Sequence, residues 1–122
     1  MSVFERMNIR ISIKRQAMET LTLEQIIALQ KQYGFDVWQR RINSGSCWTM
    51  EGWYGRRAME LIESGACMLS EERQTDYYGS LIPSRNDVKE GTKGSLGNSQ
   101  EFWQKVIDGE IIMNEDVEDE IA

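Results

Sequence analysis

The sequence predicts a mainly α-helical α+β fold: a small single domain of about four short helices, a minor two-stranded β element and a long glycine-rich loop. Its 122 residues suit one domain that buries about two-thirds of the surface of its unfolded chain. Apolar residues recur at helical spacing between capping residues and glycines. With 40% hydrophobic residues and one proline, an ordered fold is favoured over disorder. We expect a globular domain over residues 1–113 and an acidic tail over residues 114–122.

The β element is predicted from the two ends of this domain. Residues 8–14 alternate Ile9, Ile11 and Ile13 with polar residues, which is the pattern of a half-buried strand. Residues 111–113 are predicted as an edge strand beside it, so that an acidic segment would pair with a basic one. The acidic residues beyond 114 are expected to fray.

Two helices are predicted in the first half of the chain. Thr22 and Gln25 have the spacing of a capping box, and Gly34 is placed to end a helix over residues 22–33. Asp36 with Gln39 repeats the box spacing, which predicts a second helix ending at Gly45.

A third helix is predicted to begin at Thr49 as its cap and to end at Gly65. Gly52 and Gly55 weaken its first turns by roughly 1 kcal/mol each relative to Ala, so they require a packing or a binding explanation.

A short repeat links two helix ends. Residues 42–47 are echoed by residues 62–67, each with a glycine that can adopt a left-handed C-cap conformation. Cys47 and Cys67 occupy equivalent places in the echo. They are interpreted as buried, reduced thiols rather than a redox pair, because a disulfide scaffold of this size would normally use more cysteines.

Residues 76–98 form the glycine-rich loop, which is also rich in hydroxyl groups. A loop this long is usually functional or disordered, and we expect an ordered one anchored by Tyr77 and Tyr78. Ser99 is predicted to cap a last helix that stops at Gly109.

Composition excludes several kinds of chemistry. Histidine is absent, which excludes Ser/His/Asp hydrolysis, Cys/His proteolysis and His-ligated zinc. No carboxylate pair stands out as a general acid and base, so a non-enzymatic protein without cofactor or metal is expected. No apolar run approaches the roughly 20 residues of a membrane span, and no signal peptide is evident, so a cytoplasmic protein is expected.

The net charge of −6 is unevenly distributed. Residues 1–60 carry nine Lys/Arg against six Asp/Glu, whereas residues 61–122 carry five against fourteen. Seven of these acids lie in residues 108–122. The body can therefore present a local basic patch to an anion.

The candidate binding site combines rings, glycines and cations. Residues 47–57 read Cys-Trp-Thr-Met-Glu-Gly-Trp-Tyr-Gly-Arg-Arg, in which rings can stack on a planar ligand and guanidinium groups can hold phosphate. Residues 91–95, Gly-Thr-Lys-Gly-Ser, resemble a phosphate cradle in composition but lack the P-loop spacing. Core packing is the alternative for the rings at 53 and 54. The predicted ligand-binding residues are Trp53, Tyr54, Arg57, Tyr77, Tyr78, Arg85 and Lys93.

Several short strings together resemble a known group of proteins. They are Glu-Ser-Gly-Ala-Cys-Met-Leu at 63–69, Asp-Tyr-Tyr-Gly at 76–79, Pro-Ser-Arg at 83–85, Gly-Thr-Lys-Gly at 91–94, and Asn-Ser with Phe-Trp at 98–99 and 102–103. Over roughly residues 20–110, the chain resembles uncharacterised small accessory proteins of tailed bacteriophages. The resemblance implies a protein that binds and disables a host component, and it assigns no residue roles.

The leading functional hypothesis is a phage-type binding protein that counters host defence by sequestering a nucleotide-derived signal, its rings stacking and its cations pairing with phosphate. One alternative is a protein-directed inhibitor or interaction module, with the acidic tail as a nucleic-acid mimic against a host nuclease or defence protein. Another is a minor virion or assembly protein. No membrane and no sequence-specific nucleic acid is expected as a partner, and a homo-oligomer is compatible with the composition.

Overall fold

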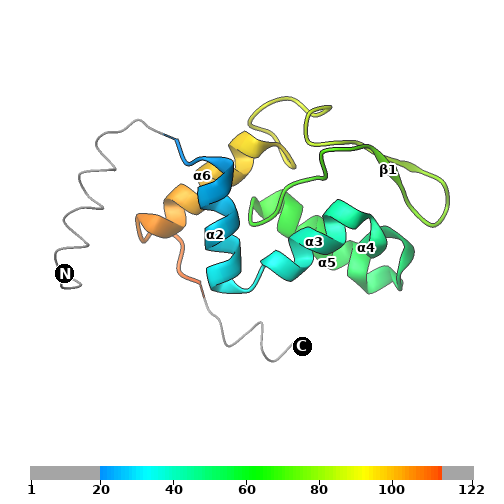
Figure 1. The fold of residues 1–122 in the computed structure, drawn as a ribbon, viewed down its shortest axis with the longest axis horizontal. Helices are drawn as coiled ribbons and strands as arrows, with labels where there is room; N and C mark the ends of the chain where they lie inside the picture. The colour runs from blue at the N-terminus through cyan, green and yellow to red at the C-terminus, as the bar shows by residue number, and fades with distance from the viewer. Residues whose placement is uncertain (1–19, 114–122) are drawn as a thin grey trace.

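The computed structural model describes residues 20–113. The predicted strand at 8–14 and the acidic tail at 114–122 lie outside these described residues. Within them, the chain forms five helices and a two-stranded antiparallel sheet in one small domain, which confirms the predicted mainly α fold class (Figure 1). The elements are α2 Leu23–Tyr33, α3 Asp36–Ser44, α4 Ser46–Thr49, α5 Gly52–Ser64, β1 Gln74–Thr75, β2 Leu81–Ile82 and α6 Leu96–Ile107.

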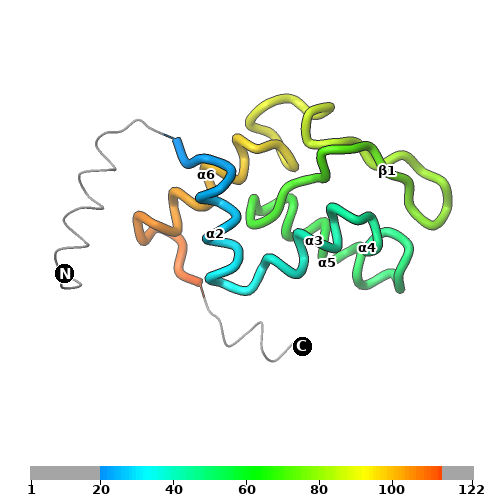
Figure 2. Tube along the Cα trace, in the orientation of Figure 1, coloured from blue at the N-terminus to red at the C-terminus, as the bar shows by residue number. Residues whose placement is uncertain are grey.

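The helix contacts form two groups, around α2 and around α5, which meet at α6. Helix α2 packs on α3 and α6, while α5 packs on α4 and α6. Figure 2 shows both ends of the described chain, blue and orange, on the side of α2 and α6. The hairpin of β1 and β2 projects from the opposite side, beyond α4. The hairpin is therefore far from the ends of the described chain.

Local capping signals predicted α2 correctly and the start of α3 incorrectly. The Thr22 hydroxyl accepts from Gln25 N at 3.1 Å, and the Gln25 side chain accepts from Thr22 N at 2.7 Å, so the capping box is confirmed. In α3 the N-cap is Phe35, which makes no side-chain cap. Asp36 instead pairs with Arg40 at 3.1 Å. The second capping box is wrong because the Gln39 side chain is buried and bonded elsewhere.

The predicted third helix is two helices. Thr49 does not cap it, because the Thr49 hydroxyl donates to Ser46 O within the short α4. Extended backbone at Met50 and Glu51 then separates α4 from α5. The predicted end at Gly65 is confirmed, since Gly65 adopts a φ of 103° as the C-cap.

The echoed helix ends are alike, as predicted. Gly45 and Gly65 are both left-handed C-caps. Cys47 and Cys67 are both buried, and no disulfide joins them.

The β pair and the start of α6 differ from prediction. Gln74 pairs with Ile82 and Thr75 with Leu81, and residues 111–113 are not a strand. The Asp76 carboxylate accepts from Tyr78 N and Ser80 N, which stabilises the tight connection between the strands. These turn bonds explain a hairpin where the sequence predicted only loop.

Helix α6 begins one turn earlier than predicted. Its N-cap is Ser95, whose hydroxyl accepts from Asn98 N at 3.2 Å. The predicted cap, Ser99, lies inside the helix, fully buried, and donates to Gly65 O at 2.6 Å. The Ser99 hydroxyl therefore bonds to the end of α5 instead of capping α6.

A buried segment, residues 65–70, connects α5 to the strand pair. Several of its backbone groups are bonded to buried side chains rather than to a sheet. Gln39 receives a bond from Met68 N and donates to Met68 O, both at 2.9 Å. Gln30 and Trp103 both donate to Ala66 O, at 2.9 and 3.2 Å. These bonds satisfy backbone groups that would otherwise be buried without partners.

Candidate functional site

The structure does not bring the seven predicted binding residues into one site. Trp53 and Tyr54 of α5 stack on each other with ring centroids 4.0 Å apart. They pack on Trp38 of α3, and the Arg41 guanidinium lies 5.3 Å from the Tyr54 ring centroid. Trp53 stays 42% exposed. The main contacts of these two rings are therefore with each other and with α3.

Tyr77 and Tyr78 lie at the tip of the hairpin. Their side chains are 74% and 86% exposed, so the loop is ordered without the burial of these two rings. Their rings meet edge to face at 5.2 Å, and Tyr77 N donates to Trp48 O at 3.1 Å. The backbone holds the hairpin to α4 and leaves both phenol rings outward.

The three predicted cations lie in separate places. Arg57 Nη1 lies 3.3 Å from Glu60 Oε1, and Lys93 Nζ lies 4.0 Å from Glu63 Oε2. Arg85 lines a different cavity, described below. None of the three lines the recess beside Tyr77 and Tyr78.

Residues 91–95 fold back on themselves. Gly91 N donates to the Ser95 hydroxyl at 2.9 Å, and Thr92 N and Ser95 N donate to Lys89 O and Thr92 O, both at 3.0 Å. These three of its five amides are thus unavailable to a phosphate, which argues against the interpretation of this segment as a phosphate cradle. Composition suggested a cradle, but a compact turn uses the donors internally.

One recess does contain part of the predicted site. We call it the hairpin recess; it has a volume of about 680 Å³ and lies between the hairpin, α4 and α5. Tyr77 and Tyr78 line it, as do the two helical glycines of α5. The residues that line it are Cys47, Trp48, Met50, Gly52, Gly55, Arg56, Met59, Glu60, Glu63, Asp76, Tyr77, Tyr78 and Ile82.

The glycines in this recess are not required by packing. A Cβ placed on Gly55 would lie 3.6 Å from Cys47 O and 3.8 Å from the Trp48 ring, which are ordinary contacts. A Cβ on Gly52 would meet only the mobile end of Arg56, at 3.2 Å. Alanine would therefore fit at both positions and would favour the helix by roughly 1 kcal/mol at Gly55 and by less at Gly52, the first residue of α5. The glycines instead leave this part of the recess without side chains.

The only thiol that lines the recess is protonated at neutral pH. Burial raises the pKa of Cys47 to about 12, and its own backbone bond and Arg41 offset this only in part. A thiolate nucleophile is therefore disfavoured at this position.

Sequence reasoning missed Met50, Met59 and Ile82 as lining residues. Met59 is 40% exposed although it is large and apolar. A signal was present, because Gly52, Arg56, Met59 and Glu63 recur at i, i+4, i+7 and i+11 on α5. That spacing defines a second face of the helix, distinct from the buried one.

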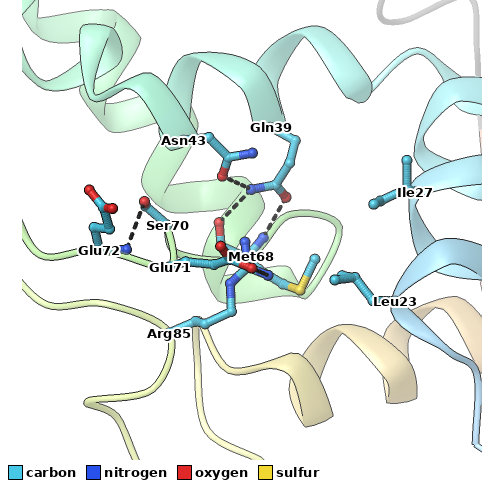
Figure 3. A pocket seen from close by; sticks show the side chains of 9 residues that line it. All are labelled: Leu23, Ile27, Gln39, Asn43, Met68, Ser70, Glu71, Glu72 and Arg85. Atoms are coloured by element: carbon cyan, nitrogen blue, oxygen red, sulfur yellow. Dashed lines mark hydrogen bonds and ion pairs between the residues drawn. The ribbon is translucent and has the colours of Figure 1, made fainter.

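A second cavity lies between α2, α3 and the segment that follows α5, and Arg85 lines it. We call it the Arg85 pocket; it has a volume of about 380 Å³. Figure 3 shows Leu23 and Ile27 on one side of it, Gln39 and Asn43 above, and Arg85 below Met68 and Glu71. The residues that line it are Leu23, Ile27, Gln39, Asn43, Met68, Ser70, Glu71, Glu72 and Arg85.

Arg85 is held firmly in this pocket. Its Nε donates to Leu69 O and its backbone N donates to Ser70 O, both at 2.8 Å. Its side chain is only 10% exposed. Burial lowers the pKa of the guanidinium from its ordinary value, and Glu71 partly offsets this effect. Arg85 is thus the one predicted cation that faces a cavity while largely removed from water.

The comparisons with known proteins place the chain in a family. Among residues 20–113, no helix is both long enough and apolar enough to cross a bilayer. No curated protein and no solved structure matches the chain. A family model matches residues 12–83, a span that contains every residue lining the hairpin recess. Because this span covers more than half of the chain, the protein belongs to that family, described as a domain of unknown function (DUF7417).

Proposed function

We propose that the protein is a non-catalytic binding module that docks an apolar segment of a partner protein in the hairpin recess. The observation that carries this proposal is the pair of glycines, Gly52 and Gly55. Both lie in a helix, both weaken it, and neither is required by the packing around it. An open recess at this position explains why the helix keeps them.

The side chains around the glycines suit an apolar ligand. Met50 and Met59 are each 40% exposed, and the two tyrosines at the hairpin tip are exposed still more. Methionine adapts to varied apolar shapes, and tyrosine supplies rigid apolar area with a polar tip. Aromatic residues and Met are enriched in protein interfaces.

The charges at the recess favour a segment with basic flanks. Among the described residues, three acidic side chains line it, Glu60, Glu63 and Asp76, against one basic side chain, Arg56. Arg57 and Lys93, which pair with Glu60 and Glu63, do not line it, so the lining itself is acidic. Electrostatic complementarity would select a partner whose apolar residues are flanked by Lys or Arg. In the phage setting that the sequence resemblance suggests, this partner would be a host defence protein.

A nucleotide-derived signal is the weaker occupant. The tyrosine rings could stack on a base, but among residues 20–113 only one basic side chain, Arg56, lines the recess. Of the cations expected to pair with phosphate, Arg85 lines the other cavity, and Arg57 and Lys93 are paired with Glu60 and Glu63 at the edge of the recess. A phosphate would also face three carboxylates, which favours the protein segment.

Selection from a displayed peptide library tests the proposal. The full chain is the bait, and each selected peptide is measured against two lysine variants. Met59→Lys places a cation in the recess. Val37→Lys is the matched control. Val37 is 38% exposed, a fraction similar to the 40% of Met59, but it lies on α3 and does not line the recess.

We expect apolar peptides with basic flanks that lose at least tenfold affinity with Met59→Lys and less than twofold with Val37→Lys. Equal loss with both variants, or no selected peptide, would overturn the proposal. Cyclic dinucleotides and ADP-ribose are tested in parallel by thermal shift. A stabilisation by either nucleotide that Met59→Lys changes and Val37→Lys does not would replace the protein segment with a nucleotide as the occupant.

A further inference from the structure

We infer that the Arg85 pocket is a second binding site, which takes a carboxylate carried on a short branched aliphatic group. This site does not share a lining residue with the hairpin recess. Its existence is independent of the proposed docking function.

The guanidinium of Arg85 is oriented by the fold before any ligand arrives. Nε is bonded to Leu69 O, and the residue's backbone is bonded to Ser70 O. The remaining Nη1 lies 3.9 Å from Glu71 Oε2, which is longer than a hydrogen bond. The terminal donors are therefore positioned beside the cavity and have only a loose counter-ion.

Glu71 is a counter-ion that a ligand can displace. Its side chain is 72% exposed, so it returns to water at little cost when another carboxylate takes its place. A ligand carboxylate can use the fork of Nη donors at hydrogen-bond distance, which Glu71 does not reach. Because Glu71 and Glu72 both line the pocket, a singly charged anion is favoured over a phosphate.

One wall of the pocket suits an aliphatic group, whereas Gln39, Asn43 and Ser70 make another part of the lining polar. Leu23 and Ile27 of α2 form one wall and Met68 lies between them and Arg85 (Figure 3). Among residues 20–113, none that lines the pocket carries an aromatic ring. Its volume is at the lower end of the range for small-molecule sites, so the ligand is small. Apolar wall and buried cation together specify a branched aliphatic acid, either free or as the C-terminus of a peptide.

Titrations followed by ¹⁵N NMR of the full chain test this site. The probes are isovalerate, its uncharged amide isovaleramide, and inorganic phosphate. We expect isovalerate to shift the signals of Ile27, Met68, Ser70 and Arg85 Nε, and the other two probes to leave them in place. Equal shifts with the amide or with phosphate, or no shift with isovalerate, would overturn the inference.

Variants at exposed positions avoid any loss of folding. Glu71→Gln removes the competing carboxylate and should tighten isovalerate binding about fivefold. Glu72→Gln, a matched neighbour that lines the same pocket, should change it less than twofold. Ile27→Asp should abolish binding, while Val37→Asp on α3 should not. An unchanged affinity in Glu71→Gln would overturn the displacement of Glu71.

The two sources of the carboxylate are then separated. The tripeptide Ala-Ala-Leu is titrated with a free C-terminus and as its C-terminal amide. Tighter binding of the free-acid peptide than of isovalerate identifies a chain terminus, and weaker binding identifies a small acid. Both results support the site, whereas equal binding of the free-acid and amide peptides contradicts it.

Discussion

The two ends of α5 use glycine for opposite reasons. At the C-terminal end, a Cβ on Gly65 would lie 2.7 Å from Phe102 Cβ and 2.9 Å from Asn98 O, so α6 packs directly on its backbone. At the N-terminal end, Cβ atoms on Gly52 and Gly55 would meet no fixed obstruction. Glycine therefore permits close packing at one end and keeps a recess open at the other.

This difference assigns stability mainly to one end of α5 and binding mainly to the other. The closed end, where residues 65–70 meet α2, α3 and α6, contains buried residues whose polar groups are bonded. The open end, around the hairpin recess, contains large apolar side chains exposed to water. Substitutions should lower stability at the closed end and alter binding at the open end.

The largest effect is expected from Trp103 at the closed end. Its side chain is fully buried, lies 5.7 Å from Tyr33 and 6.1 Å from Phe35 between ring centroids, and donates to Ala66 O. Trp103→Ala should lower the free energy of unfolding by about 3–5 kcal/mol. Trp53→Ala, at the open end, should lower the free energy of unfolding by less than half as much. Urea denaturation measures both, and equal losses would contradict the comparison.

Gly65→Ala should have the next largest effect, about 3 kcal/mol of destabilisation. The new methyl group overlaps Phe102 and also imposes a strained left-handed conformation. Gly34→Ala is the matched control, because Gly34 has a φ of 86° but nothing within 4 Å of the added Cβ. It should cost only the conformational part, about 1 kcal/mol. Thermal unfolding of the two variants separates overlap from strain.

Gly55→Ala should stabilise the protein by about 1 kcal/mol, because alanine favours the helix and its Cβ fits. The same methyl group narrows the hairpin recess, so peptides selected on the native chain should bind more weakly. The comparison predicts opposite signs for stability and binding. A lower stability of Gly55→Ala would instead show that the packing around Gly55 requires glycine.

Tyr78→Ser should change the free energy of unfolding by less than about 0.5 kcal/mol, since the side chain is 86% exposed. Binding of recess peptides should nevertheless weaken. Calorimetry of unfolding and of peptide binding on the same sample distinguishes the two effects. A large loss of stability would show that the ring supports the hairpin.

The smallest expected effect concerns pH. Bonds from the Arg73 side chain and from Ser84 N hold the pKa of Asp87 well below its usual range. A depressed pKa contributes stability above the unfolded pKa, about 3.9, which is lost as the pH falls towards the folded value. Asp87→Asn should therefore lower the urea midpoint at pH 7 more than at pH 3. Arg73→Gln should reproduce this pattern, and a pH-independent difference would contradict it.

Part of the candidate site could be predicted from the sequence. Tyr77 and Tyr78 line the hairpin recess, and the sequence indicates that Gly52 and Gly55 need a packing or a binding explanation. The sequence leaves two roles for Trp53 and Tyr54, ligand binding and core packing. Helical spacing alone does not show which neighbour covers a helix face, so the packing of these rings on Trp38 could not be predicted. Arg85 faces a cavity, but not the one that contains the tyrosines.

The sequence by itself determined the elements whose signals are local: the α2 capping box and the glycine ends at Gly34, Gly45 and Gly65. It also determined the mainly α class and the burial of both cysteines. Tertiary structure decided the use of Gln39 and Ser99, whose polar groups had equally good local alternatives. Burial removed water as a competing partner, so each group bonded to the segment packed against it rather than to its neighbours in the chain.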